Sequence, residues 1–265
     1  MSEKRYALSA RGLFKRFGGL TVINDVTLNL EKGARHALIG PNGAGKTTFI
    51  NLLTGVLEPS AGSILLEGCD VTTLAPHQRV KLGMVRTFQI NQLFDSFTPL
   101  QTLALTVSER RGMGTGLWRP LGRDAAVMSR CRELLEMFHL EKVMDLPTHV
   151  LPYGKRRQLE IAIALACEPS VLLLDEPVAG VPAGERNELL AIIDELPADV
   201  SILLIEHDMD LVFSFAQRMT VLVNGALLTE ADPAAVAHDP RVREVYLGQG
   251  ASGAAGSMRY GGQGG

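Results

Sequence analysis

The chain has 265 residues, which suits one large domain or one domain with a sizeable insertion. Apolar residues make up 46% of it and charged residues 21%, a balance that can fill a hydrophobic core. The formal net charge of −3 gives no indication of nucleic-acid binding. The three cysteines are far apart and lack metal-ligand spacing, so we interpret them as free thiols in a reducing compartment.

The sequence predicts neither a secretory signal nor a membrane-spanning segment. Residues 1–12 lack an apolar stretch suited to a secretory signal, and no apolar run approaches the ~18 residues that span a bilayer. We therefore expect a soluble, cytoplasmic protein. Residues 251–265 are rich in glycine and have little to bury, which predicts a disordered tail.

The first part of the chain follows an order of strand, glycine-rich turn and helix. Residues 22–30 alternate apolar and polar side chains, as a half-buried strand does, and residues 35–39 form a short apolar run. After the glycine-rich turn, residues 49–57 have helical spacing. Another strand is predicted over residues 63–67.

The middle of the chain differs in character. It carries short helical patterns around a glycine-rich loop at 112–122, and an amphipathic helix is predicted over 124–138. We interpret about residues 95–155 as a mainly helical subdomain inserted into an α/β core, the whole domain covering residues 1–250.

Strands and helices alternate again after this insertion. A helix is predicted over 156–167, and the next helix has an apolar face at Leu189, Leu190, Ile193 and Leu196. Further strands are predicted over 171–174, 201–205 and 219–223. The pattern predicts an α/β fold with a mainly parallel sheet flanked by helices.

The turn after the second predicted strand is a phosphate-binding motif, GPNGAGKT, with the strand before it and the helix after it that the motif requires. Its glycines let backbone N–H groups face one concavity at the positive end of a helix, which attracts phosphate oxygens. Lys46 would bind the β- and γ-phosphates of ATP, and the Thr47 hydroxyl would bind Mg²⁺. The predicted nucleotide-binding residues are Gly40, Pro41, Asn42, Gly43, Ala44, Gly45, Lys46, Thr47 and Thr48.

Two carboxylates follow the buried strand at 171–174. Asp175 stands where a carboxylate faces the Mg²⁺ of a phosphate-loop site, and Glu176 can orient or deprotonate an attacking water. An Asp-Glu pair after a strand, taken alone, more often marks a solvated strand end than a catalytic site. The phosphate loop in the same chain favours the catalytic interpretation.

The order of the phosphate loop, Gln89, LPYGK, LLLDEP and His207 resembles the nucleotide-binding subunit of an ATP-binding cassette transporter over roughly residues 7–248. The stretches RFGGLTVINDVTL, MVRTFQ, PYGKRRQLEIAIALA, IEHDMDLV and DPRVREVYLG resemble the branched-chain (hydrophobic) amino acid uptake branch. Within it, the chain is nearer to the subunit type with FGG near its start. The resemblance implies a phosphate-loop NTPase fold in which an antiparallel β edge accompanies the mainly parallel sheet.

The resemblance implies three further site residues. Phe17 would stack on adenine, with a core phenylalanine as an equally good alternative. Gln89 would contact Mg²⁺ and the attacking water rather than be a solvated loop amide. His207, after a terminal strand, would contact the γ-phosphate rather than serve a structural role.

The resemblance also implies partners. Two such domains would sandwich two nucleotides head to tail, so LPYGK of a second ATP-binding subunit, identical or different, would complete each site. The helical insertion and the Gln89 loop would contact two transmembrane permease subunits at the cytoplasmic face of the inner membrane. A periplasmic substrate-binding protein would act indirectly.

The signature segment departs from the family pattern, because Pro152 stands where a serine hydroxyl would bind the partner's γ-phosphate. The N–H groups of Tyr153 and Gly154, at the start of a helix, remain as donors. Lys155 is a cationic candidate beside them, although with Arg156 and Arg157 it equally suits a solvated basic face, which we slightly favour.

A second departure is Pro182, where the family usually carries an acidic residue or asparagine that contacts the partner. Because proline cannot supply that side-chain contact, communication between the two nucleotide sites is in doubt. Glu176 and His207 still favour a working ATPase, one that turns over more slowly than its relatives.

Four classes of function compete. The leading one is the ATP-hydrolysing subunit of an importer for branched-chain or hydrophobic amino acids or related small solutes. A lipid or polysaccharide exporter subunit is the nearest alternative. A cassette ATPase acting on DNA or ribosomes would usually carry a coiled-coil insertion, a second cassette or basic extensions, and a GTPase would carry an Asn-Lys-x-Asp motif; we find none of these.

Overall fold

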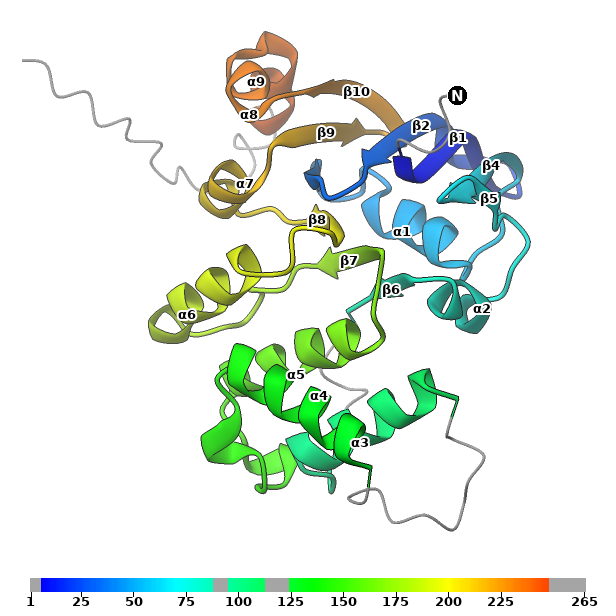
Figure 1. Ribbon diagram of the computed structural model, residues 1–265. Coiled ribbons are helices and arrows are strands. Elements are labelled where there is room, and N and C mark those ends of the chain that lie inside the picture. Colours follow the sequence, from blue (N-terminus) through cyan, green and yellow to red (C-terminus); the bar gives the residue numbers. More distant parts are fainter. Residues whose placement is uncertain (1–5, 88–94, 113–123, 248–265) are drawn as a thin grey trace, which may run out of the picture.

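The computed structural model describes residues 6–87, 95–112 and 124–247, which form two sheets and surrounding helices (Figure 1). The first sheet has the order β2-β1-β4-β5 and every neighbouring pair in it is antiparallel. Its strands are β1 (Tyr6–Phe17), β2 (Leu20–Glu31), β4 (Ala61–Leu66) and β5 (Cys69–Asp70).

The second sheet has the order β10-β9-β3-β8-β7-β6, and all its neighbouring pairs are parallel except β10 with β9. Its strands are β3 (Arg35–Ile39), β6 (Met84–Arg86), β7 (Val171–Asp175), β8 (Ser201–Ile205), β9 (Arg218–Val223) and β10 (Ala226–Ala231). The predicted α/β fold with a mainly parallel sheet and an antiparallel β edge is confirmed.

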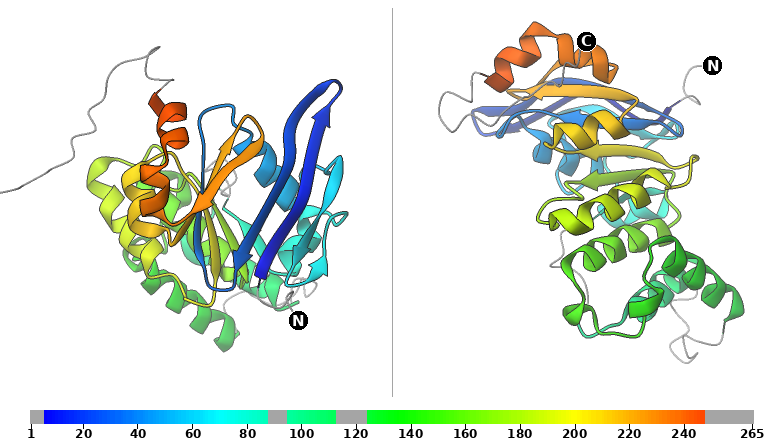
Figure 2. Two further views of the ribbon diagram at one scale, coloured as in Figure 1. Left: turned by 90° about the horizontal axis from the view of Figure 1, so that it is seen from above. Right: turned by 90° about the vertical axis from the view of Figure 1, so that its left-hand side faces the viewer.

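Helices cover the second sheet and form a group of their own at one end of the molecule (Figures 1 and 2). The helices are α1 (Lys46–Thr54), α2 (Pro76–Lys81), α3 (Pro99–Arg110), α4 (Ala125–Met137), α5 (Tyr153–Ala166), α6 (Ala183–Asp194), α7 (Met209–Phe215), α8 (Pro233–His238) and α9 (Pro240–Leu247). Helices α3–α5 lie between β6 and β7 in sequence. The bounds of the predicted helical subdomain, about residues 95–155, stay a prediction, because α5 continues to Ala166. Over the described ranges, no helix is both long and apolar enough to cross a membrane.

The parallel strands bury both of their faces, so their alternate residues enter two different cores. Leu172 and Leu174 of β7 pack in one cluster with residues of α3–α6. Val171 and Leu173 pack in the other, with α1 and the antiparallel sheet. Helix α1 is thereby held between the two sheets, which fixes the position of the loop that precedes it.

His36 of β3 is a buried polar residue in the sheet. Its Nε2 lies 2.8 Å from Thr220 Oγ1 on β9, and the Thr220 hydroxyl donates to Glu230 at 3.1 Å. The pKa of His36 is lowered from 6.5 to about 4, chiefly by burial; the charge of Glu230 opposes this shift and that of Arg218 adds to it. The folded protein therefore holds this imidazole neutral.

We expect this shift to make stability depend on pH. Because the folded-state pKa lies below the unfolded one, the unfolded chain binds more protons between pH 6.5 and 4, so stability falls as the pH falls through this window. The loss is about 3 kcal/mol at pH 4. Urea unfolding of His36→Gln between pH 7 and 4 should show a flatter dependence. The exposed His77→Gln should retain the wild-type dependence, and identical curves for all three proteins would contradict the assignment.

Candidate nucleotide-binding site

The loop between β3 and α1 has the backbone shape that the phosphate motif requires. Gly43 and Gly45 have φ values of 78° and 101°, in the left-handed region that favours glycine. A Cβ on Gly40 would lie 2.2 Å from the carbonyl oxygen of Leu222, so only glycine fits there. Gly45 is the N-cap residue of α1, and thus the loop presents its backbone at the positive end of that helix.

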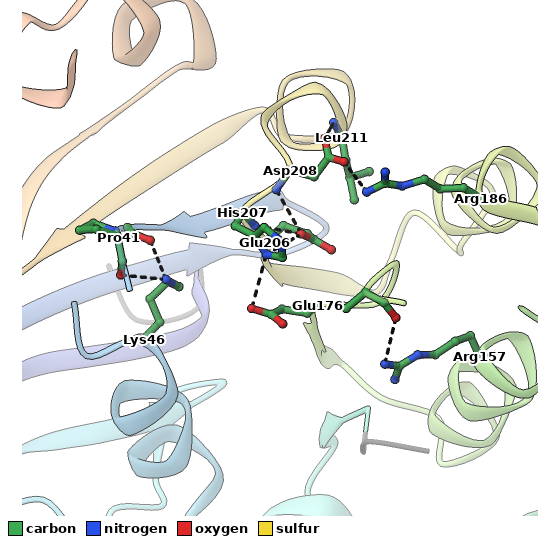
Figure 3. Close-up of polar contacts among 11 residues, drawn as sticks. Pro41, Lys46, Arg157, Glu176, Arg186, Glu206, His207, Asp208 and Leu211 are labelled. Carbon is green, nitrogen blue, oxygen red and sulfur yellow. Dashed lines mark hydrogen bonds and ion pairs between the residues drawn. The ribbon is translucent and has the colours of Figure 1, made fainter. Parts of the chain in front are cut away.

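Lys46 is the first residue of α1 and reaches back over the loop. Its Nζ donates to the carbonyl oxygens of Gly40 at 2.6 Å and Pro41 at 3.1 Å (Figure 3). Burial lowers its pKa, while Glu176 and Asp175 oppose that shift through their charge. The ammonium group therefore lies within the electrostatic reach of the acidic pair. It would release the carbonyl oxygens of Gly40 and Pro41 when a phosphate arrives. Asn42, Gly43 and Thr47 are exposed beside it, while Thr48 is half-buried.

The acidic pair stands where β7 ends. Asp175 accepts a hydrogen bond from Arg86 Nη2 at 2.5 Å, and both side chains are mostly buried. Glu176 has φ 46°, a conformation that few residues other than glycine adopt, while its N–H donates to Ile205 O at 2.9 Å. Its carboxylate is 46% exposed and so is accessible to water. Strained backbone of this kind is concentrated at functional sites.

His207 follows β8 and lies against Glu176. Its Nδ1 is 3.5 Å from Glu176 Oε1 and 3.5 Å from Glu206 Oε2 (Figure 3). Glu206 is buried, and its Oε2 accepts from the N–H groups of His207 at 2.9 Å and Asp208 at 3.3 Å. Within the described part of the chain, Glu206 Oε1 has no hydrogen-bond partner. The imidazole is thus an exposed group on a loop anchored by a buried carboxylate.

The signature segment leads into α5. Pro152 is the exposed N-cap residue of this helix, which begins at Tyr153 without a side-chain cap. The N–H of Gly154 donates to Glu185 Oε2 of α6 at 2.8 Å. One of the two N–H groups expected to bind a phosphate is therefore already bonded to a carboxylate of the same chain. The Glu185 carboxylate would have to move away before the Gly154 N–H could bind a phosphate.

The basic residues after Gly154 do not form one solvated face. Arg157 is buried, bonded to Glu160 at 2.8 Å and to the Tyr153 hydroxyl at 3.2 Å, so the interpretation as a solvated basic face is wrong for this residue. Lys155 Nζ donates to Glu188 Oε1 at 2.9 Å and lowers the pKa of that carboxyl. In this chain, Lys155 therefore faces α6.

Phe17 ends β1 and is 48% exposed, with Lys15 Nζ 5.0 Å from its ring centre. The alternative of a core phenylalanine is therefore wrong, and an exposed ring remains available for stacking. The adenine contact itself stays a prediction. Gln89 lies outside the described residues.

The second departure, Pro182, is the N-cap residue of α6 and also lacks a side-chain cap. The first turn of the helix behind it carries two charged residues with separate partners. Glu185 binds Gly154, as described above, and Arg186 forms an ion pair with Asp208, next to His207 (Figure 3). The start of α6 thus touches both the signature segment and the His207 loop.

Sequence reasoning missed four residues at this site: Arg86, Glu185, Arg186 and Glu206. The sequence could have indicated two of them, because Arg86 lies in the MVRTFQ stretch and Glu206 directly precedes His207. The contacts of Glu185 and Arg186 depend on how α6 packs, which no motif records.

The two halves of the predicted nucleotide site lie apart in this chain. Figure 3 shows Lys46 and Arg157, the latter on the signature helix α5, on opposite sides of Glu176. Helix α5, which begins within the signature segment, therefore lies across Glu176 from Lys46 of the chain's own phosphate loop.

Comparison with known proteins gives matches over most of the chain. A family model described as ABC transporter matches residues 23–179, and one described as branched-chain amino acid ATP-binding cassette transporter matches residues 226–252. The high-affinity branched-chain amino acid transport ATP-binding protein BraF of Pseudomonas aeruginosa is 38% identical, covering 92% of this chain and 99% of its own length. LivG of Escherichia coli K12, of the same description, is also 38% identical, over 91% and 98%.

Solved structures agree with these relatives. An ATP-binding cassette of an ABC transporter in its ADP conformation is 29% identical, with a TM-score of 0.80 over 92% of this chain and 99% of that one. A nucleotide-free cassette matches with a TM-score of 0.79 over 91% and 98%. The chain therefore belongs to the ATP-binding cassette family, as an ATP-hydrolysing cassette of its branched-chain amino acid branch.

Proposed function

We propose that this chain hydrolyses ATP to energise the uptake of branched-chain or hydrophobic amino acids, or related small solutes, across the inner membrane. The observation that carries this proposal is the match of the branched-chain model to residues 226–252. In the same chain, Lys46 of the phosphate loop lies within reach of the charges of Asp175 and Glu176, and His207 lies 3.5 Å from Glu176. The names of BraF and LivG point to the same class of substrate.

The chemistry is the in-line attack of water on the γ-phosphate, in which positioning and charge stabilisation contribute most. Lys46 leaves the carbonyl oxygens of Gly40 and Pro41 and binds the phosphates together with the N–H groups of the loop. Glu176 orients the water and accepts its proton, since its carboxylate is accessible to solvent. His207, 3.5 Å from that carboxylate, contacts the γ-phosphate.

Mg²⁺ is the metal that such a site requires. Thr47, Asp175 and Gln89 would hold it, and hydroxyl, carboxylate and amide oxygens are the donors that this ion prefers. The position of Asp175 fits, because its charge acts on the Lys46 ammonium group beside the phosphate loop. When bound, the ion neutralises negative charge on the phosphate oxygens.

We further propose that a second ATP-binding subunit, identical or different, completes each site. The separation of Lys46 from α5 supports this arrangement, because a second copy placed head to tail would bring its own α5 to the open phosphate loop. The chain would then lie at the cytoplasmic face of the membrane, bound to two permease subunits through the helical insertion, with a periplasmic binding protein delivering the solute.

The test is purification of the intact complex from native membranes through a tag on this chain. Mass spectrometry should identify two membrane-spanning permeases, and ligand screening of the associated binding protein should give branched-chain or related amino acids. ATPase activity of the reconstituted complex should increase with the loaded binding protein. Co-purification with ribosomes or DNA and no membrane protein would overturn the transport proposal.

A further inference from the structure

Arg86, the last residue of β6, joins two parts of the site that are distant in sequence. Its Nη2 donates to Asp175 Oδ2 at 2.5 Å, and its Nη1 donates to Asn51 Oδ1 at 2.8 Å. Its side chain is 19% exposed and that of Asp175 23% exposed, so solvent screens this ion pair less than a surface one. The planar guanidinium thus holds a strand end and a helix at the same time.

Asn51 belongs to the helix that follows the phosphate loop. It lies four residues after Thr47 in α1, so the two side chains share one face of that helix. Thr47 and Asp175 are the two described residues assigned to Mg²⁺. Arg86 therefore connects the helix that carries one of them directly to the carboxylate of the other.

The next residue adds a second restraint on Asp175. Thr87 Oγ1 accepts a hydrogen bond from Asp175 N at 3.3 Å, and Thr87 N donates to Leu173 O at 3.0 Å. The end of β6 thus holds both the backbone and the side chain of Asp175. Arg86 binds Oδ2, and this ion pair does not use the other carboxylate oxygen, Oδ1.

We propose that Arg86 is a positioning residue for the metal site: it fixes the Asp175 carboxylate relative to α1, so that Mg²⁺ meets its oxygen ligands already arranged. This inference rests on the proposed role of Asp175 as a Mg²⁺ ligand. Arg86 does not touch the metal or the nucleotide, and its effect passes through Asp175 and Asn51.

The test measures binding of a fluorescent ATP analogue to the full-length chain, first in EDTA and then during a Mg²⁺ titration. Arg86→Lys keeps the charge but cannot hold both partners as the guanidinium does. Asn51→Ser removes the acceptor on α1. Both variants should bind the analogue in EDTA within twofold of wild type, but should need about tenfold more Mg²⁺ for half-maximal tightening.

Arg110→Lys is the matched control, because this arginine pairs with Glu168 and Lys81 O away from the site; its Mg²⁺ titration should equal that of wild type. An unchanged Mg²⁺ requirement in both Arg86→Lys and Asn51→Ser would overturn the inference. So would an equal loss of binding in EDTA, since that would indicate a purely structural role.

Asp175→Asn separates this inference from the proposal on which it rests. If Asp175→Asn leaves the Mg²⁺ requirement unchanged, the assignment of Asp175 as a ligand fails. If it raises the requirement while Arg86→Lys and Asn51→Ser do not, the ligand assignment stands and the positioning role of Arg86 fails.

Discussion

Glu176→Gln is expected to lower the steady-state rate of ATP hydrolysis by about 10²- to 10⁴-fold, the range that a general base contributes. Glutamine has nearly the same shape but cannot accept a proton from water. The effect is expected at this residue in particular, because the Glu176 backbone has a left-handed φ of 46° and its carboxylate lies 3.5 Å from the His207 imidazole. Affinity for ATP should stay within a fewfold of wild type, since Lys46 and the phosphate loop are intact.

Phosphate release by the reconstituted complex measures the rate, and a fluorescent nucleotide measures binding. Glu195→Gln supplies the same chemical change at the exposed C-cap of α6 and should leave both unchanged. Full retention of turnover by Glu176→Gln would contradict the catalytic assignment of this residue.

Arg79→Met is expected to lower the free energy of unfolding by about 3–5 kcal/mol, among the larger effects of a single substitution. Arg79 is 1% exposed, and its guanidinium donates to Leu52 O at 2.8 Å and Leu53 O at 2.5 Å, at the C-terminal end of α1. It also donates to Leu74 O at 2.9 Å and Thr72 O at 2.8 Å. Methionine would remove the donated hydrogen bonds from these buried carbonyls, of which Leu52 O would keep only the bond from Gly55 N.

Urea unfolding followed by circular dichroism measures this loss. Arg130→Met is the control, because Arg130 forms an ion pair with Glu133 on the surface of α4, and such pairs contribute about 0–1 kcal/mol. The Arg79 variant should also bind ATP poorly, since α1 carries the phosphate loop. A stability within about 1 kcal/mol of wild type would refute the structural role assigned to Arg79.

The strands of the parallel sheet could be predicted from the sequence because they are short apolar runs between glycines or polar residues. The predicted strand at 35–39 matches β3, and those at 171–174 and 219–223 each fall one residue short of the observed strands. β1 was not predicted, because its pairing with β2 shifts register at several points, so its apolar residues lose a clean period of two. The short β10 likewise depends on its neighbour β9.

The phosphate loop, Asp175 and Glu176 could also be predicted from the sequence, because each follows from a local constraint, whereas the role of His207 was implied only by the family resemblance. Phosphate binding needs glycines and a lysine at fixed spacing before a helix, and strand ends of a parallel sheet meet at one edge. Local chemistry therefore determines which residues occur at this edge, without any knowledge of the helical insertion.

Only the tertiary structure shows which side chains hold the residues of the predicted nucleotide site in place. The contacts Arg86–Asp175, Glu185–Gly154 and Arg186–Asp208 join residues 89, 31 and 22 positions apart, respectively. Such pairs depend on how α6 packs against α5 and the Asp208 loop and how β6 lies beside β7, and no periodicity encodes that packing. The sequence by itself determined the nucleotide-binding half of the site, while the fold decided how its acidic residues are held, because long-range packing sets those distances.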